Sequence, residues 1–353
     1  MLKRLRRRVS GTTIVMWLIG FSILAVVIGG MIATLASGRY TREDWINLTV
    51  YGISQGGVYA LIALGYTMVY GILRMINFAH GDVFMAGAYI GYFVATAFDR
   101  TGFLDSHLVL ALIITVLVAM GSCLVIAVLI ERIAYRPLRR APRLVPLITA
   151  LGVSFFLEYT FLGLFGSGIK GYPEPEQLKG TITIFGIEIL KTQALVIASA
   201  VLMLALLWFF VQRTKTGKAM QAVSEDKDAA ALMGINVDRI IVITFAVGGA
   251  LAGAAGVLYG LLFRQVYFFT GFLPGLKAFT AAVLGGIGNI AGAMLGGMFL
   301  GIAESLFPNL VLDGLGIPAP YQLKDALAFL LLVLVLIFRP TGILGERLSS
   351  KKA

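Results

Sequence analysis

The sequence predicts an all-α protein whose helices cross a membrane many times. Hydrophobic residues make up 59% of the 353 positions and charged residues only 13%, with a mean hydropathy of +0.91, whereas soluble domains carry about 25% charged residues. Apolar runs long enough to cross a bilayer recur along the whole chain. Lysine and arginine gather between these runs, so the net charge of +11 reflects loops beside a membrane and does not indicate nucleic-acid binding.

The apolar runs define the predicted spans, about eight to ten in all. The first run is about 24 residues long, above the roughly 15-residue limit of a signal-peptide core, so we expect an uncleaved span. The run 277–307 contains GGIGN at 285–289. It is expected to form two short helices or a re-entrant pair, because non-helical backbone at membrane depth must be covered by protein or water. The runs lie near residues 13–36, 45–72, 83–98, 107–130, 144–166, 193–212, 240–263, 277–307 and 321–338.

The basic residues predict which loops face the cytoplasm, since lysine and arginine near span ends are held on that side. Five lie within residues 3–8, five in loop 131–143, five in loop 213–239 and four from Arg339 onward. These segments lie on the same side of the membrane if successive spans alternate in direction and the run 277–307 begins and ends on one side of the membrane. Both ends of the chain are therefore expected in the cytoplasm.

Loop 213–239 contains a predicted short helix. Ser224 is expected to cap its start, where acidic residues such as Asp228 suit the positive end of a helix. Alanines continue the helix, and Gly234 ends it as a residue free to adopt a left-handed conformation. Two interpretations stay open: an amphipathic helix on the membrane surface, or a helix that docks into a groove of a cytoplasmic partner, where Ala230 is small enough to sit flush.

Several polar side chains fall within or beside apolar runs. NFAHGD at 77–82 places Asn77, His80 and Asp82 around a glycine and predicts a helix break near membrane depth. His80 could line a route through the membrane or brace a turn by bonding backbone carbonyls. Both interpretations remain open.

Gln55, Tyr59 and Tyr66 share one face of the second span, because they follow each other at helical spacing. They could line the same route or satisfy one another against a neighbouring helix. Glu158 and Glu304 lie within apolar runs, and an acid at membrane depth costs roughly 2.5–3.5 kcal/mol on insertion scales, so each is a functional candidate. An interhelical hydrogen bond is the alternative for both.

DAAALMG at 228–234 resembles the E-A-A-x3-G cytoplasmic-loop motif of bacterial ABC importer permeases, with Asp in place of Glu. The usual I-x-L-P continuation is absent, and TFAV stands at 244–247. This departure fits the high-affinity branched-chain amino acid permeases, LivH-type subunit. The resemblance runs from about residue 45 to 345 and rests on these collinear segments: QGGVYALIALGYTMVYGILRMINFAHGDVFMAGAY (55–89), GKAMQAVSEDKDAAALMGINVDR (217–239), GLKAFTAAVLGGIGNIAGAMLGG (275–297) and RPTGILG (339–345).

The resemblance implies a type II importer fold in the bacterial inner membrane. It implies a second permease subunit that forms a heterodimer with this chain, two cytoplasmic ATP-binding subunits, and an external solute-binding protein that delivers the amino acid. The chain then divides into a basic N-terminus with an extra span (1–44), a permease domain (45–345) and a basic tail (346–353).

The implied residues that couple the permease to the ATP-binding subunits are Lys218, Asp228, Ala229, Ala230 and Gly234. The path candidates are Gln55, Tyr59, Tyr66, Asn77, His80, Asp82 and Glu158, with Gly286, Gly288 and Asn289 at the GGIGN break as half-helix ends.

Enzymatic motifs are missing from the sequence. The GK at 217–218 has Gln212 where a phosphate-binding loop requires its first glycine, and Ala219 follows the lysine. The chain is therefore expected to lack its own ATPase site, metal and cofactor, so energy must come from a partner. A permease for urea or short amides, an ion-coupled secondary transporter and a channel remain alternatives.

Overall fold

The computed structural model describes residues 11–345 except 140, 143, 185 and 340. The basic residues predicted to be cytoplasmic at 3–8, and the tail 346–353, lie outside this range. Within it, nine helices are long and apolar enough to cross a membrane, which confirms the predicted polytopic helical bundle. The α-helices are α1 (Gly11–Ser37), α2 (Arg42–Leu73), α3 (His80–Arg100), α4 (Phe103–Ser106), α5 (Leu108–Ile130), α6 (Leu144–Phe165), α7 (Lys191–Arg213), α8 (Lys215–Glu225), α9 (Lys227–Leu232), α10 (Val237–Phe263), α11 (Phe272–Gly285), α12 (Ile290–Phe307) and α13 (Lys324–Phe338).

Short elements complete the chain. A π-helix, η1 (Glu131–Tyr135), and a 3-10 turn, η2 (Arg136–Leu138), prolong α5 beyond the predicted loop boundary, and a second π-helix, η4 (Pro308–Leu312), prolongs α12. Two further 3-10 turns are η3 (Glu176–Leu178) and η5 (Pro320–Leu323). The strands, which the sequence analysis did not anticipate, are β1 (Lys170–Gly171), β2 (Thr181–Ile184), β3 (Ile187–Leu190) and β4 (Gln265–Val266); β1 pairs antiparallel with β4, and β2 with β3.

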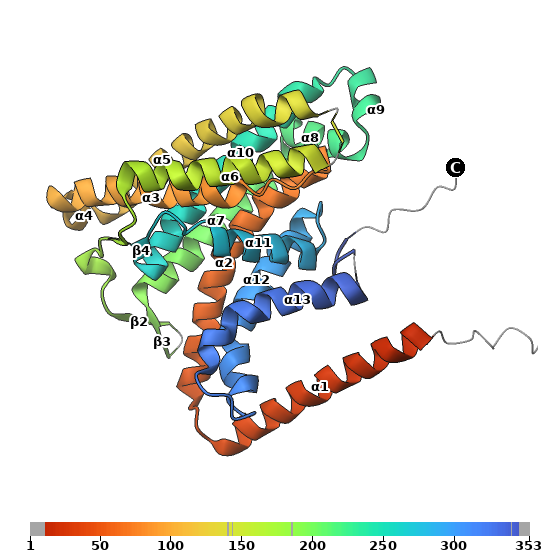
Figure 1. The fold of residues 1–353 in the computed structure, drawn as a ribbon. Coiled ribbons are helices and arrows are strands. Elements are labelled where there is room, and N and C mark those ends of the chain that lie inside the picture. The colour runs from red at the N-terminus through yellow and green to blue at the C-terminus, as the bar shows by residue number, and fades with distance from the viewer. Residues whose placement is uncertain (1–10, 140, 143, 185, 340, 346–353) are drawn as a thin grey trace, which may run out of the picture.

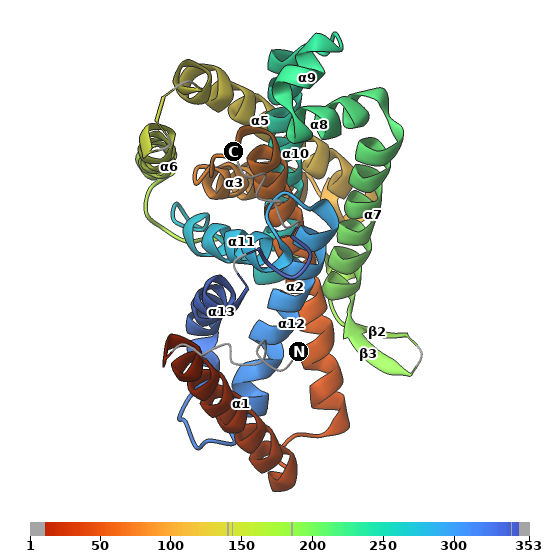
Figure 2. The same cartoon turned by 90° about the vertical axis from the view of Figure 1, so that its right-hand side faces the viewer.

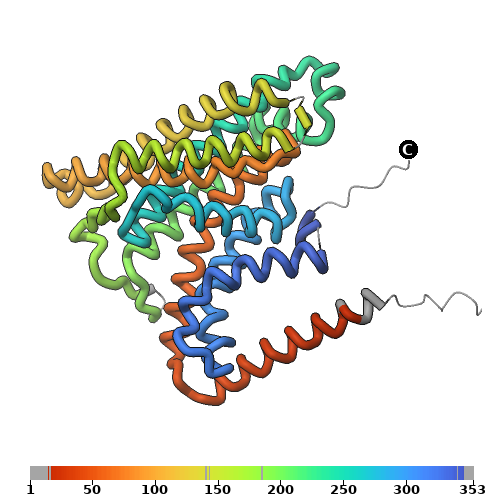
Figure 3. Tube along the Cα trace, in the orientation of Figure 1, coloured from red at the N-terminus to blue at the C-terminus, as the bar shows by residue number. Residues whose placement is uncertain are grey.

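The two ends of the bundle differ in what they carry. In Figure 1 the described start of α1, the α5–α6 connection, α8, α9 and the end of α13 lie at the right. The β2–β3 hairpin, α4 and β4 lie at the left. The trace in Figure 3 alternates between these ends from helix to helix. The basic loops of the described chain therefore gather at one end, which we call the basic end.

Helix α2 forms the centre of the bundle and is buried along most of its length. It packs closely against α12, where a side-chain carbon on Gly301 would lie 2.3 Å from the backbone nitrogen of Gly56. With no hydrophobic drive between helices in lipid, such close approach at small residues stabilises helix pairs. Figure 2 shows α11 between α3 and α13, beside this central pair.

The predicted break at GGIGN is confirmed, because α11 ends at Gly285 and α12 begins at Ile290. Gly286 and Gly288 have φ of +108° and +99°, values that L side chains rarely adopt. Asn289 caps α12 by accepting a hydrogen bond from the backbone N–H of Gly292 at 3.0 Å. The chain therefore returns from the basic end to the opposite end through α12.

Candidate functional site

Gln55 and Tyr59 belong to a buried hydrogen-bond chain at the centre of the bundle. Gln55 donates from Nε2 to the hydroxyl of Tyr59 at 2.6 Å, and Tyr59 donates to Oε2 of Glu304 on α12 at 3.0 Å. All three side chains are buried. The predicted polar face of the second span is thus joined to Glu304, which the sequence analysis treated separately.

Lys277 on α11 completes this cluster, and the sequence analysis missed it. Its ammonium group forms ion pairs with Glu304 and, at 2.5 Å, with Asp325 in the first turn of α13. It also lies 3.5 Å from the hydroxyl of Tyr59. As the first residue of the run 277–307, Lys277 looks like a boundary residue in the sequence. We call Tyr59, Lys277, Glu304 and Asp325 the charged cluster.

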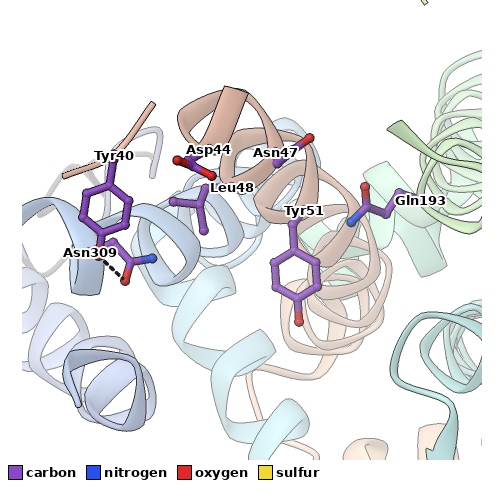
Figure 4. Close-up of a pocket in the computed structure, with 7 residues that line it drawn as sticks. All are labelled: Tyr40, Asp44, Asn47, Leu48, Tyr51, Gln193 and Asn309. Atoms are coloured by element: carbon purple, nitrogen blue, oxygen red, sulfur yellow. Dashed lines mark hydrogen bonds between the residues drawn. The ribbon is translucent and has the colours of Figure 1, made fainter. Parts of the chain in front are cut away.

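A polar groove lies at the far end of α2 from the basic end. Its volume is about 350 Å³. Its walls come from α2, α7, η4 and the segment between α1 and α2. Figure 4 shows Tyr40 and Asn309 at one side of the groove, Gln193 at the other and Tyr51 between them. The lining residues are Tyr40, Asp44, Asn47, Leu48, Tyr51, Gln193 and Asn309. Tyr51 precedes Gln55 by one helical turn, so the groove continues the polar face of α2.

His80 starts α3 inside the bundle and is buried against α2. Its imidazole occupies the space beside Gly65, where an added side-chain carbon would lie 2.1 Å from Nε2. The ring of Tyr66 packs edge-on to it with centroids 4.9 Å apart. Asn77 accepts a hydrogen bond from the hydroxyl of Tyr135 at 3.0 Å. These contacts place Tyr66 in a separate set from Tyr59, and Nε2 of His80 is buried without a hydrogen-bond partner in the described part of the chain. Both roles of His80 stay predictions.

Asp82 and Glu158 form a buried acid pair between α3 and α6. Both side chains are buried, and Ser154 donates its hydroxyl to Oδ2 of Asp82. Asp82 Oδ1 and Glu158 Oε1 are buried without a hydrogen-bond partner in the described part of the chain. Both acids thus lie inside the bundle, where an ionised carboxylate is costly. An interhelical hydrogen bond and a place on the path both stay predictions for Glu158.

Gly288 and Asn289 lie elsewhere than expected. The break was expected to supply half-helix ends along the path, yet Gly288 is exposed and lies beside Gly71, near the end of α2. The amide of Asn289 donates to the carbonyl of Leu344 at 2.9 Å. The break thus faces the basic end, because the segment 341–345 covers it. The start of α11, like that of α3, lies inside the bundle, where Gly271 packs against the backbone of Gly81.

The predicted helix in loop 213–239 is α9, but its cap is corrected. Asp226 caps α9, because its backbone is extended and its carboxylate accepts the N–H groups of Asp228 and Ala229 at 2.9 and 3.0 Å. Ser224 still belongs to α8 and donates to the carbonyl of Gln221. Two good capping residues two positions apart cannot be distinguished until the end of α8 is known.

The C-terminal end of α9 is as predicted. Gly234 has φ +83°, its N–H donates to the carbonyl of Ala231 at 3.0 Å, and the N–H of Ile235 donates to that of Ala230 at 3.1 Å. Such a left-handed residue closes the free carbonyls at a helix end. The chain therefore turns back towards α10 at Gly234.

The exposed residues of α9 differ from the predicted ones. Ala230 is 4% exposed and packs into the chain's own core, so it cannot sit in a partner's groove. Leu232 and Met233 are instead 89% and 83% exposed. Asp228, Ala229 and Lys218 are also exposed, and Lys218 donates to Gln221 at 3.2 Å. The outward face therefore has an apolar tip formed by Leu232 and Met233, which we call the α9 tip.

Arginines tie loop 213–239 to the membrane helices. Arg74, after α2, donates to the carbonyl of Ser224 at 3.2 Å. Arg139, after α5, forms ion pairs with Glu131 and with Asp238 at the start of α10. Burial, followed by the charges of Arg139 and Arg74, lowers the pKa of Lys227. The loop is thus packed onto the ends of three helices.

No described group of three or more His, Cys, Asp or Glu side chains could hold a metal ion. The arrangement instead offers polar and charged groups inside a helical bundle, a groove at one end and a packed loop with an apolar tip at the other. Such a layout is that of a transport protein.

Comparison with known proteins agrees with this layout. BraD of Pseudomonas aeruginosa, described as a high-affinity branched-chain amino acid transport system permease protein, is 43% identical over 309 residues, which cover 86% of this chain and 96% of BraD. LivH of Escherichia coli, described in the same way, is 41% identical over 300 residues, or 84% of this chain and 94% of LivH. A protein of Methanocaldococcus jannaschii, described as a probable branched-chain amino acid transport permease, is 29% identical over 296 residues. These residues cover 81% of this chain and 88% of that protein.

No solved structure matches the chain. The family described as branched-chain amino acid transport system / permease component matches residues 48–336. This match begins within α2 and ends within α13, so it overlaps every described span that follows α1. The chain therefore belongs to the family of permease components of branched-chain amino acid transport systems.

Proposed function

We propose that this chain is the membrane-spanning permease subunit of an ATP-binding-cassette importer in the bacterial inner membrane. In this proposal it forms, with a second permease subunit, the path for branched-chain or related hydrophobic amino acids delivered by an external solute-binding protein. The names of BraD and LivH support the class of cargo. The sequence has no phosphate-binding loop, so in this proposal two cytoplasmic ATP-binding subunits supply the energy.

The observation that carries the proposal is the α9 tip. Exposed apolar residues beside polar loop residues are typical of a surface that a partner covers. Leu232 and Met233 lie at the end of a short helix closed by Asp226 and Gly234. An apolar helix face that docks into a groove of the ATP-binding subunit fits this geometry.

The same loop is placed to transmit a displacement. Arg74 and Arg139 join it to the ends of α2 and α5, while α7 and α10 enter and leave it directly. A movement of α9 driven by ATP-binding subunits would therefore reach four membrane helices. Packed elements respond to such a push by shifting between discrete arrangements.

The orientation follows from the same proposal. The basic end would face the cytoplasm and the polar groove would face the solute-binding protein. Amino acid released by that protein would enter beside Tyr51 and pass along the polar face of α2.

Isolation of the tagged chain from its native membranes tests the function. We expect an ATP-binding subunit and a second permease subunit to co-purify, and the reconstituted complex to take up labelled leucine only with ATP and binding protein. Uptake by this chain alone, driven by an ion gradient, would contradict the proposal in favour of a secondary transporter. Uptake of labelled urea in place of leucine would keep the importer and correct its cargo.

A further inference from the structure

The charged cluster brings together three helices at one point. Lys277, Glu304 and Asp325 come from α11, α12 and α13, and their side chains are 6%, 1% and 40% exposed. Lys277 is paired with both acids. Asp325 is thus the member of the cluster that remains accessible from outside.

The cluster is costly if its role is only to hold helices together. Removing an ion from water costs several kcal/mol, and apolar residues of similar size often hold a core as well as a buried ion pair does. Here one ammonium group serves two carboxylates, so the cluster carries an acid in excess. Glu304 is also fixed on its second oxygen by Tyr59, which Gln55 supports.

The two acids differ in how firmly they are held. Both oxygens of Glu304 have partners, Lys277 and Tyr59. The described contact of Asp325 is Lys277, at the exposed start of α13. Asp325 is therefore the carboxylate that another carboxylate can replace on Lys277 at the lower cost.

The polar groove leads towards this cluster. Tyr51 lines the groove and precedes Gln55 and Tyr59 on the same face of α2. The groove and the charged cluster therefore lie along one face of α2.

We propose that the charged cluster binds the two charged ends of the amino acid in transit. This inference rests on the proposed function and names the residues that recognise the cargo. Lys277 takes the α-carboxylate in place of Asp325, and Glu304 takes the α-ammonium. An α-amino acid carries both charges on one carbon, so a route through an apolar bundle requires both partners at once. Release of Asp325 frees the start of α13 from α11 as cargo enters.

The test uses Glu304→Gln in the complete complex. Glutamine keeps the shape and can still accept from Tyr59, while Lys277 keeps its pair with Asp325. We expect normal amounts of complex, normal co-purification of ATP-binding subunits and ATP-dependent leucine uptake lowered at least about tenfold, since a buried charge has lost its partner. The matched control is Glu188→Gln, the same change on the exposed β3 strand, which should transport leucine like the parent.

A second variant, Lys277→Met with Glu304→Gln, removes the ion pair altogether. A cluster that only joins helices predicts normal uptake in both variants, because the two substituted side chains form a neutral pair and Asp325, at 40% exposed, still reaches water. Leucine uptake within about twofold of the parent in either variant would overturn the proposal, because a twofold change corresponds to less than half of the free energy of one pKa unit. Uptake of urea by the parent complex would also overturn it, since urea lacks both charges. Failure of ATP-binding subunits to co-purify with the parent would count against the proposed function alone, because leucine uptake by the parent and the variants can still be compared in intact cells.

Discussion

Leu344 donates its backbone N–H to the carbonyl of Gly285 at 3.0 Å, which joins the RPTGILG segment to the GGIGN break. The backbone N–H of Ile343 likewise donates to the carbonyl of Leu284 at 2.8 Å. Helix ends leave carbonyls without partners, and these two bonds satisfy them at the end of α11. The two motifs, far apart in the sequence, therefore form one structural unit at the basic end.

This unit predicts unequal tolerance at the two glycines of the break. Both have positive φ, so an alanine costs roughly 1–2 kcal/mol at either position. At Gly286 the new carbon would also lie 2.4 Å from the backbone nitrogen of Gly345, whereas at Gly288 it would meet no atom within 4 Å. We expect Gly286→Ala to lower the midpoint of thermal unfolding of the purified complex clearly more than Gly288→Ala.

Leu300→Ile, a change of equal volume in the buried part of α12, serves as the control for both glycine variants. It should cost less than about 1.5 kcal/mol. Equal unfolding midpoints for Gly286→Ala and Gly288→Ala would show that the segment 341–345 does not cover the break.

The acid pair gives a second prediction. Because an ionised acid is costly at membrane depth, Glu158→Gln, which keeps the shape of the buried side chain without its charge, should be tolerated. Glu158→Ala removes most of that side chain and should cost roughly 2–5 kcal/mol, as large-to-small changes in a core do. Thermal unfolding of the two variants at neutral pH checks the difference. A glutamine variant as unstable as the alanine variant would mean that the fold requires a charge at Glu158.

The sequence was a good guide where local chemistry decides the outcome. The span limits follow from apolar length, and the break at Gly286 follows from glycine and the loss of helical bonds. The left-handed end of α9 at Gly234 could be predicted in the same way. These features depend on residues that are neighbours in the chain.

The remaining features depend on partners that only the fold brings together. Lys277 pairs with Glu304 and Asp325 on other helices, and its place at the edge of an apolar run conceals its burial. Ala230 suits either a partner's groove or the chain's own core, and helical spacing cannot distinguish the two. Ser224 and Asp226 are equally good caps until the end of α8 is known.

The orientation gives a third prediction. Cysteine at Lys218, an exposed position at the basic end, should resist an impermeant thiol reagent added to intact cells. Cysteine at Glu188, exposed on β3 at the opposite end, should react readily. The native Cys123 is buried and should contribute little labelling in either variant. Labelling of the first position and protection of the second would invert the proposed topology.

The α9 tip gives the last prediction, which separates a coupling helix from a helix resting on the membrane surface. Leu232→Ser removes an apolar side chain that is 89% exposed, so the fold of the subunit should not suffer. If an ATP-binding subunit covers this residue, the change should weaken its co-purification and reduce leucine uptake, at a cost of up to about 2–4 kcal/mol for a residue central to an interface. Ala230→Glu should be harmful for another reason, because the new carboxylate would enter the chain's own core beside α8 and lower the amount of folded protein.

The matched control for Leu232→Ser is Leu190→Ser, at an exposed leucine on β3 far from the loop. It should retain both the ATP-binding subunit and leucine uptake. Normal co-purification and uptake for Leu232→Ser would remove the α9 tip from the coupling surface.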